Sequence, residues 1–131
     1  MGRIDGGLRS LFKERMPLVH WQSVETGATG RGVPDSNGCH RGVEFWVEFK
    51  QTEGYTIDLR PEQIGWLCRR ARAGGRCFVA VRRRCAPGPR RPGADELWLF
   101  PGALAREIKA SGLRDCPYDY VLGAWTGGPA R

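Results

Sequence analysis

The chain has 131 residues, 40% of them hydrophobic and 10% aromatic, which predicts one folded domain over 1–131 and excludes a disordered chain. It has neither the apolar run of roughly 20 residues that a membrane helix needs nor the apolar N-terminal stretch of a signal peptide, so we expect a cytoplasmic protein without membrane contact. The formal net charge of +7 favours an acidic partner such as nucleic acid.

Hydrophobic periodicity and turn residues predict an alternation of helices and strands. Leu8, Leu11 and Phe12 have the spacing of an amphipathic helix. The elements expected in chain order are a helix over 7–15, strands over 18–24, 33–37 and 43–50, a helix over 60–73, a strand over 77–81, a basic exposed loop over 82–94, and a strand and a helix within 95–131. We expect the strand over 33–37 to end in a turn at Asn37-Gly38.

The strand over 43–50 is the clearest element, because apolar and polar residues alternate along it. This period of two places Glu48 and Lys50 on one face, whereas valines and phenylalanines fill the other. Glu44 shares the face of Glu48 but lies about 13 Å away by strand rise, so we interpret it as structural.

Asp35 and the pair Glu48 and Lys50 are the residues that indicate chemistry. Hydrolysis of a phosphodiester bond needs an activated water and stabilisation of extra negative charge, and carboxylates that share one or two magnesium ions meet both needs. Asp35 and Glu48, on neighbouring strands at the same level, would be those ligands. The ammonium of Lys50 would orient the attacking water or offset charge in the transition state.

These residues resemble a known motif. Pro34-Asp35 followed by Glu48-Phe49-Lys50 is similar to the PD-(D/E)xK nuclease superfamily. Within it, the resemblance is to the virus-type replication-repair nuclease (VRR-NUC) group and kindred Holliday-junction resolvases. It is carried by four motifs within residues 8–82, namely Gly32-Val33-Pro34-Asp35, Trp46-Val47-Glu48-Phe49-Lys50, Pro61-Glu62-Gln63 and Gly74-Gly75-Arg76-Cys77-Phe78-Val79-Ala80-Val81.

The resemblance implies an α/β, restriction-endonuclease-like core of helix, three strands, helix and strand, with a central mixed sheet flanked by helices. It implies that Asp35, Glu48 and the main-chain carbonyl of Phe49 bind Mg²⁺, for which Mn²⁺ can substitute. It also implies that Gln63, in the first turn of the second helix, positions water or substrate. The alternative for Gln63 is a solvent-exposed residue at a helix start.

An upstream acid often completes the site in this family. Glu25, at the end of the first strand, is the preferred candidate, and Glu14 in the first helix is the second. A site without either residue is the remaining possibility.

Positive charge is concentrated in one segment, because residues 69–94 hold nine arginines and no acidic residue. The remaining 12 basic and 14 acidic residues leave a balance of −2. Arginine binds phosphate bidentately, so this segment is interpreted as a contact surface for nucleic acid. The alternative interpretation is a solvated face that only aids solubility. The expected DNA contacts are Arg69, Arg70, Arg72, Arg82, Arg83 and Arg84. No base-reading module is recognisable, which favours recognition of DNA shape.

The resulting hypothesis is a divalent-metal-dependent DNA endonuclease that acts on branched DNA or Holliday junctions in replication, repair or recombination. A homodimer is expected, since a junction has paired strands to cut, in a bacterial or phage-infected cell. One alternative is a restriction-type or general nicking nuclease. The alternative of another class is a catalytically inactive, DNA-binding accessory protein.

Overall fold

The structure, a computed structural model, describes residues 7–24, 32–114 and 121–124. Its helical elements are α1 (Leu8–Arg15), α2 (Pro61–Arg72), the single 3₁₀ turn η1 (Gly102–Leu104) and α3 (Ala105–Ser111). Its strands are β1 (His20–Ser23), β2 (Ser36–His40), β3 (Val43–Thr52), β4 (Cys77–Cys85), β5 (Ala94–Pro101) and β6 (Val121–Ala124). The expected order of helix, three strands, helix and strand is therefore confirmed.

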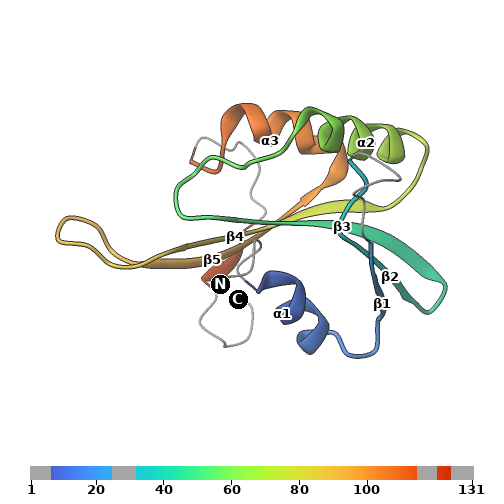
Figure 1. Cartoon of the computed structure of the whole chain (residues 1–131), viewed down its shortest axis with the longest axis horizontal. Coiled ribbons are helices and arrows are strands. Elements are labelled where there is room, and N and C mark those ends of the chain that lie inside the picture. Colours follow the sequence, from blue (N-terminus) through green and yellow to red (C-terminus); the bar gives the residue numbers. More distant parts are fainter. Residues whose placement is uncertain (1–6, 25–31, 115–120, 125–131) are drawn as a thin grey trace.

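The strands form one mixed sheet in the order β1-β2-β3-β4-β5-β6. Strands β3 and β4 are parallel, because α2 carries the chain back across the sheet between them, and every other neighbouring pair is antiparallel. The predicted mixed sheet flanked by helices is thus confirmed (Figure 1).

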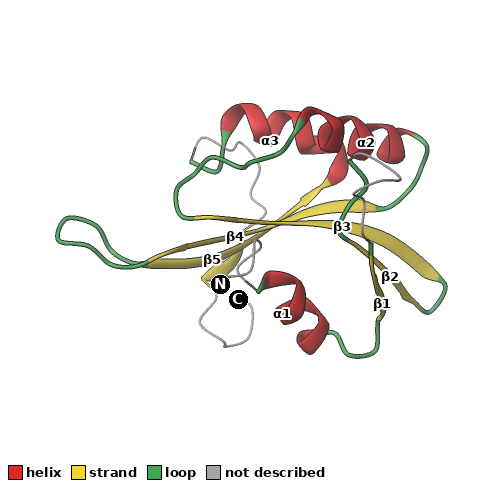
Figure 2. Ribbon diagram, viewed as in Figure 1, coloured by secondary structure: helices red, strands yellow, loops and turns green. Residues whose placement is uncertain are grey.

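Helices cover both faces of the sheet (Figure 2). Each face buries its own apolar cluster. Helix α1 covers one face, where the cluster comprises Leu8, Val47, Phe49, Ala80 and Leu97. Helices α2 and α3 cover the other, where the buried cluster comprises Ile57, Leu59, Leu67, Cys77, Val79, Val81, Phe100, Ala105, Ile108 and Leu113. Alternate residues of β3 therefore point to different helices, which places Glu48 on the α2 side.

The turn between β2 and β3 differs from the prediction. It lies at Arg41-Gly42, both with positive φ (50° and 79°), as a two-residue hairpin turn requires. Gly38 lies inside β2 instead, where a side chain would overlap the ring of Phe45 on the facing strand. Asn37 binds across the strands to Glu44, which supports the structural interpretation of that residue.

The basic loop is shorter than predicted. Strand β4 continues to Cys85 and β5 begins at Ala94, so the connection is residues 86–93. The strands extend this far because Arg82 and Arg83 find acidic partners on β5. Beyond β5, strand β6 was not predicted at all, and its pairing with β5 includes a register shift.

Four cysteines lie among the described residues. Cys39, Cys68, Cys77 and Cys85 are all free, and Cys77 is the one of them that is buried. Cys116 lies outside the described residues. No helix in the described ranges is long and apolar enough to cross a membrane.

Candidate active site at the meeting of β2, β3 and α2

Asp35 and Glu48 meet because of the register between β2 and β3. Ser36 pairs with Val47 at the end of this antiparallel ladder, so Asp35, one residue earlier, lies opposite Glu48. The Oδ2 atom of Asp35 accepts a hydrogen bond of 3.0 Å from the main-chain N–H of Phe49. The two carboxyl groups predicted to share a site are therefore brought together.

Gln63 closes the site from the α2 side, where a side-chain amide spans helix and sheet. Its Nε2 atom donates to Oε1 of Glu48 at 3.1 Å, and its Oε1 atom accepts from the N–H of Arg60 at 2.9 Å. Gln63 is only 5% exposed and Glu48 only 2%, so the alternative of a solvent-exposed helix-start residue is excluded. Pro61 begins the helix, where a missing N–H costs no hydrogen bond.

Gly32 sets how closely the segment before Asp35 approaches α2. Its φ is +86°, and a Cβ there would overlap the main-chain carbonyl of Glu62 in the first turn of the helix. On the other side, the N–H of Val24 donates to the carbonyl of Asp35 at 2.7 Å. Asp35 is thus held between β1, β3 and the start of α2.

The electrostatics of the site centre on Glu48. Burial, followed by the hydrogen bond and the negative charge of Asp35, raises the pKa of Glu48 from its ordinary 4.5 to about 9. The positive charges of Lys50 and Arg60 oppose this rise without cancelling it. At neutral pH Glu48 therefore keeps its proton, which supports its hydrogen bond to Asp35.

Lys50 occupies the predicted position, two residues after Glu48 on the same face of β3, and is half-buried. Arg60 is a further cation near Glu48 that was not predicted, since its only signal in the sequence is its place just before the helix-starting Pro61. The positive charges of Lys50 and Arg60 both lower the pKa of Glu48.

The predicted third acid is not found among the described residues. Glu25 lies outside them. Glu14 is exposed on α1, which packs on the opposite face of the sheet through Phe12 and Phe49. Within the described ranges no group of three or more His, Cys, Asp and Glu side chains could hold a metal ion. The described site thus has two carboxylates.

The six predicted DNA-contacting arginines fall into two groups. Arg69, Arg70 and Arg72 are exposed in the last turn of α2, where Arg70 lies over the rings of Trp66 and Trp46, and Arg72 lines a hollow of about 280 Å³. On β4, Arg82 binds Asp95 through two bonds of 2.9 Å, whereas Arg84 is exposed.

The remaining arginine of β4, Arg83, binds Glu96 at 3.0 Å. The side chains of Arg82 and Arg83 are 12% and 11% exposed. These two guanidinium groups therefore have partners within the protein already.

Comparison with known proteins adds a structural likeness. No family model matches the chain, and no curated protein matches it. Among solved structures, Hjc, a Holliday junction resolvase from the archaeal hyperthermophile Archaeoglobus fulgidus, is similar with 19% sequence identity and a TM-score of 0.47, over 74% of this chain and 75% of that chain. A likeness this distant says nothing of activity, and the VRR-NUC resemblance stays a prediction.

The raised pKa of Glu48 predicts how stability depends on pH. The folded protein keeps a proton that the unfolded chain releases above pH 4.5, so metal-free protein should lose stability as the pH rises from 4.5 towards about 9. Glu48→Gln keeps a neutral donor and acceptor in the same place. Thermal melts in chelator should therefore show a shallower decline for this variant and a higher Tm than wild type near pH 9, by several degrees.

Glu44→Gln, on the same strand and face, is the matched control and should follow the wild-type pH profile. Parallel profiles for Glu48→Gln and wild type would show that Glu48 is already ionised in the folded protein.

A second prediction concerns Gly32. Gly32→Ala should destabilise the protein by more than the about 1–2 kcal/mol of a left-handed alanine, because the new Cβ also overlaps α2. Gly42→Ala is the control, since Gly42 has a similar φ of +79° and a Cβ added there would meet no atom within 4 Å. Urea denaturation measures both losses. Equal losses would mean that Gly32 is needed for its φ alone.

Proposed function

We propose that the protein is a divalent-metal-dependent DNA endonuclease that hydrolyses phosphodiester bonds at Asp35 and Glu48. The observation that carries this proposal is the juxtaposition of two carboxyl groups, in which Glu48 is buried and hydrogen-bonded to Gln63 and Asp35 lies opposite it, just before the neighbouring strand. Two acids held together in a fold cost stability, which is typical of sites retained for function. Lys50 and Gln63 lie beside this pair, where they would stabilise negative charge on a phosphate and orient the Glu48 carboxyl, respectively.

The residues fit a hard divalent cation such as Mg²⁺ or Mn²⁺. Both side chains supply oxygen, and Mg²⁺ is commonly held by one or two carboxylates with water and substrate phosphates as its other ligands. The N–H of Phe49 points to Asp35, so its carbonyl faces the same edge of β3. This supports Phe49 as the main-chain ligand, and Glu25 remains the proposed further acid. A bound cation would replace the proton of Glu48, offset phosphate charge and activate water.

The chain's own groups have distinct tasks in this proposal. Gln63 holds the Glu48 carboxyl in one orientation, because its amide is fixed at both ends by hydrogen bonds. Lys50 presents a positive charge beside that carboxyl, where it stabilises the additional negative charge that develops on a phosphate under attack. Asp35 is oriented by the N–H of Phe49.

The proposed substrate is branched DNA or a Holliday junction, cut by a homodimer. Its support is the motif resemblance together with a surface whose arginines suit phosphate rather than base contacts. A general nicking nuclease and an inactive accessory protein are the competing functions. The accessory function is disfavoured because Asp35, Glu48, Lys50 and Gln63 are all present and joined in one site.

The nuclease proposal predicts metal-dependent cleavage. Wild type should cut a labelled four-way junction in Mg²⁺ or Mn²⁺ and not in chelator, and faster than it cuts single strand, plain duplex or flap. Lys50→Ala should slow cleavage at least about 100-fold, because a charge-stabilising group is lost. Glu44→Gln is the control that should cut at the wild-type rate. Equal cleavage rates on all four substrates would support a general nuclease instead of a junction-selective one. Binding without any cleavage would favour the inactive accessory protein.

Removal of one carboxylate should separate binding from cleavage. Asp35→Ala should abolish cutting, whereas its affinity for junction DNA in chelator should equal or exceed that of wild type, because repulsion between carboxylate and phosphate falls. Fluorescence anisotropy measures the affinity. A variant that cuts normally would show that Asp35 does not belong to the active site.

A further inference from the structure

The longest projection of the described chain is the hairpin between β4 and β5, which extends beyond the helices on the left of Figure 1. Residues 84–94, called the arm below, contain Arg84, Arg90 and Arg91 and no acidic residue. All three arginines are exposed, and none forms an ion pair with another described residue. The arm therefore carries a charge of +3 that no ion pair within the described residues neutralises.

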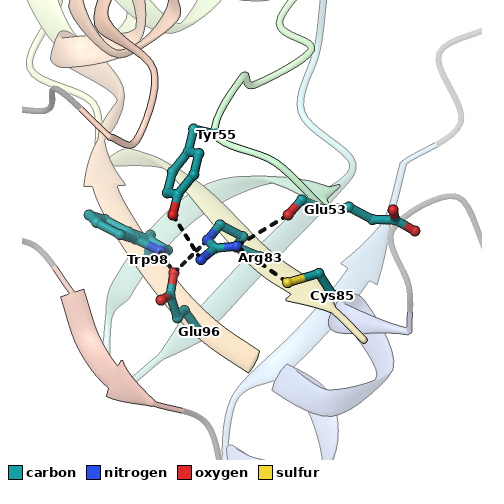
Figure 3. A network of polar contacts seen from close by, with 6 residues as sticks. All are labelled: Glu53, Tyr55, Arg83, Cys85, Glu96 and Trp98. Atoms are coloured by element: carbon teal, nitrogen blue, oxygen red, sulfur yellow. Dashed lines mark hydrogen bonds and ion pairs between the residues drawn. The ribbon is translucent and has the colours of Figure 1, made fainter. Parts of the chain in front are cut away.

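The base of the arm is anchored on both faces of β4. On one face Arg82 binds Asp95 through two hydrogen bonds. On the other, Arg83 binds Glu96, lies 4.3 Å from the ring centroid of Tyr55 and donates to the Tyr55 hydroxyl (Figure 3). The acidic residues nearest the arm are thereby neutralised, and the direction of its base is held.

The tip of the arm is built to keep its shape. Gly88 and Arg91 exchange main-chain hydrogen bonds of 3.0 and 3.4 Å, which closes a tight turn. Prolines at 87, 89 and 92 restrict the backbone around it. A stiff projection that buries no apolar cluster costs chain entropy without stabilising the core, so its use is expected outside the fold.

The arm continues β4 in the direction in which β3 also runs, past the level of Glu48. Strands β3 and β4 run in parallel, and Glu48 pairs with Val79. Pro89, at the tip, comes ten positions after Val79, which corresponds to about 33 Å of fully extended chain. At 3.4 Å per base pair, this reach equals about 10 base pairs, close to one turn of duplex DNA.

We propose that the arm grips duplex DNA on the flank of the bound substrate, about one helical turn from the carboxyl pair. Arg84, Arg90 and Arg91 bind phosphates there, and the ribbon is narrow enough to enter a DNA groove. The inference rests on the proposed function for the identity of the polyanion. It also assigns Arg82 and Arg83 to the base of the arm rather than to DNA.

The test compares two triple variants that remove the same charge. Arg84→Gln/Arg90→Gln/Arg91→Gln alters the arm, and Arg41→Gln/Arg76→Gln/Arg106→Gln alters three exposed arginines elsewhere. Binding to a long labelled duplex is measured by anisotropy in chelator at several salt concentrations. The arm variant should bind the duplex at least about tenfold more weakly than wild type. The slope of log binding constant against log salt concentration should be smaller in magnitude by about 2 to 3. The control variant should match wild type in both quantities.

A shortened arm tests the reach independently. Cys85 pairs with Ala94, so Asn-Gly in place of residues 86–93 should close the hairpin with a two-residue turn and leave both ion pairs at its base intact. Wild type should lose affinity when the duplex flank falls below about 10 base pairs, and the shortened protein should not. Thermal melts should coincide for the two proteins.

Three results would overturn the arm proposal: equal losses in both triple variants, an unchanged salt slope in the arm variant, or equally tight binding of a single strand of the same length. None of these measurements depends on cleavage. A protein that never cuts DNA but grips duplex through the arm would contradict the nuclease proposal alone. One that cuts junctions with arm-independent binding would contradict the arm alone.

Discussion

The site depends on a carboxyl group buried where apolar packing would place a hydrophobic side chain. Glu48 lies in the central strand β3, between valine and phenylalanine residues that fill the opposite face. A carboxyl at 2% exposure must be neutralised or hydrogen-bonded. Glu48 is both, because its raised pKa keeps it protonated and the amide of Gln63 donates to it. Gly32, the capping of α2 and the β2–β3 register all maintain this arrangement.

Much of the site follows from local sequence patterns. Alternation along β3 was enough to place Glu48 and Lys50 on one face, since the period of a strand is fixed by its geometry. The hydrogen bond between Gln63 and Glu48 was not predicted, because it depends on how α2 crosses the sheet. The family resemblance implied only that Gln63 belongs to the site. The crowding around Gly32 was likewise invisible, because the atoms concerned are 30 residues further along the chain.

The predictions that failed concern pairing between distant segments. Asn37-Gly38 is a residue pair typical of tight turns, yet β2 continues through it. Gly38 is needed there because a side chain would overlap the ring of Phe45 on the facing strand. Arg82 and Arg83 looked like loop residues, yet Asp95 and Glu96 neutralise them and extend the sheet. The charge of the basic segment is therefore divided between structural ion pairs, the end of α2 and the arm.

Metal binding measured by titration calorimetry in two buffers of different ionisation enthalpy tests the central claim most directly. If a cation displaces the proton that Glu48 keeps, Mn²⁺ should bind near neutral pH with release of about one proton per ion. Glu48→Gln should bind more weakly and release none, whereas Glu44→Gln should match wild type. Absence of Mn²⁺ binding, or binding without proton release that Glu48→Gln leaves unchanged, would contradict the assignment of this pair as a metal site.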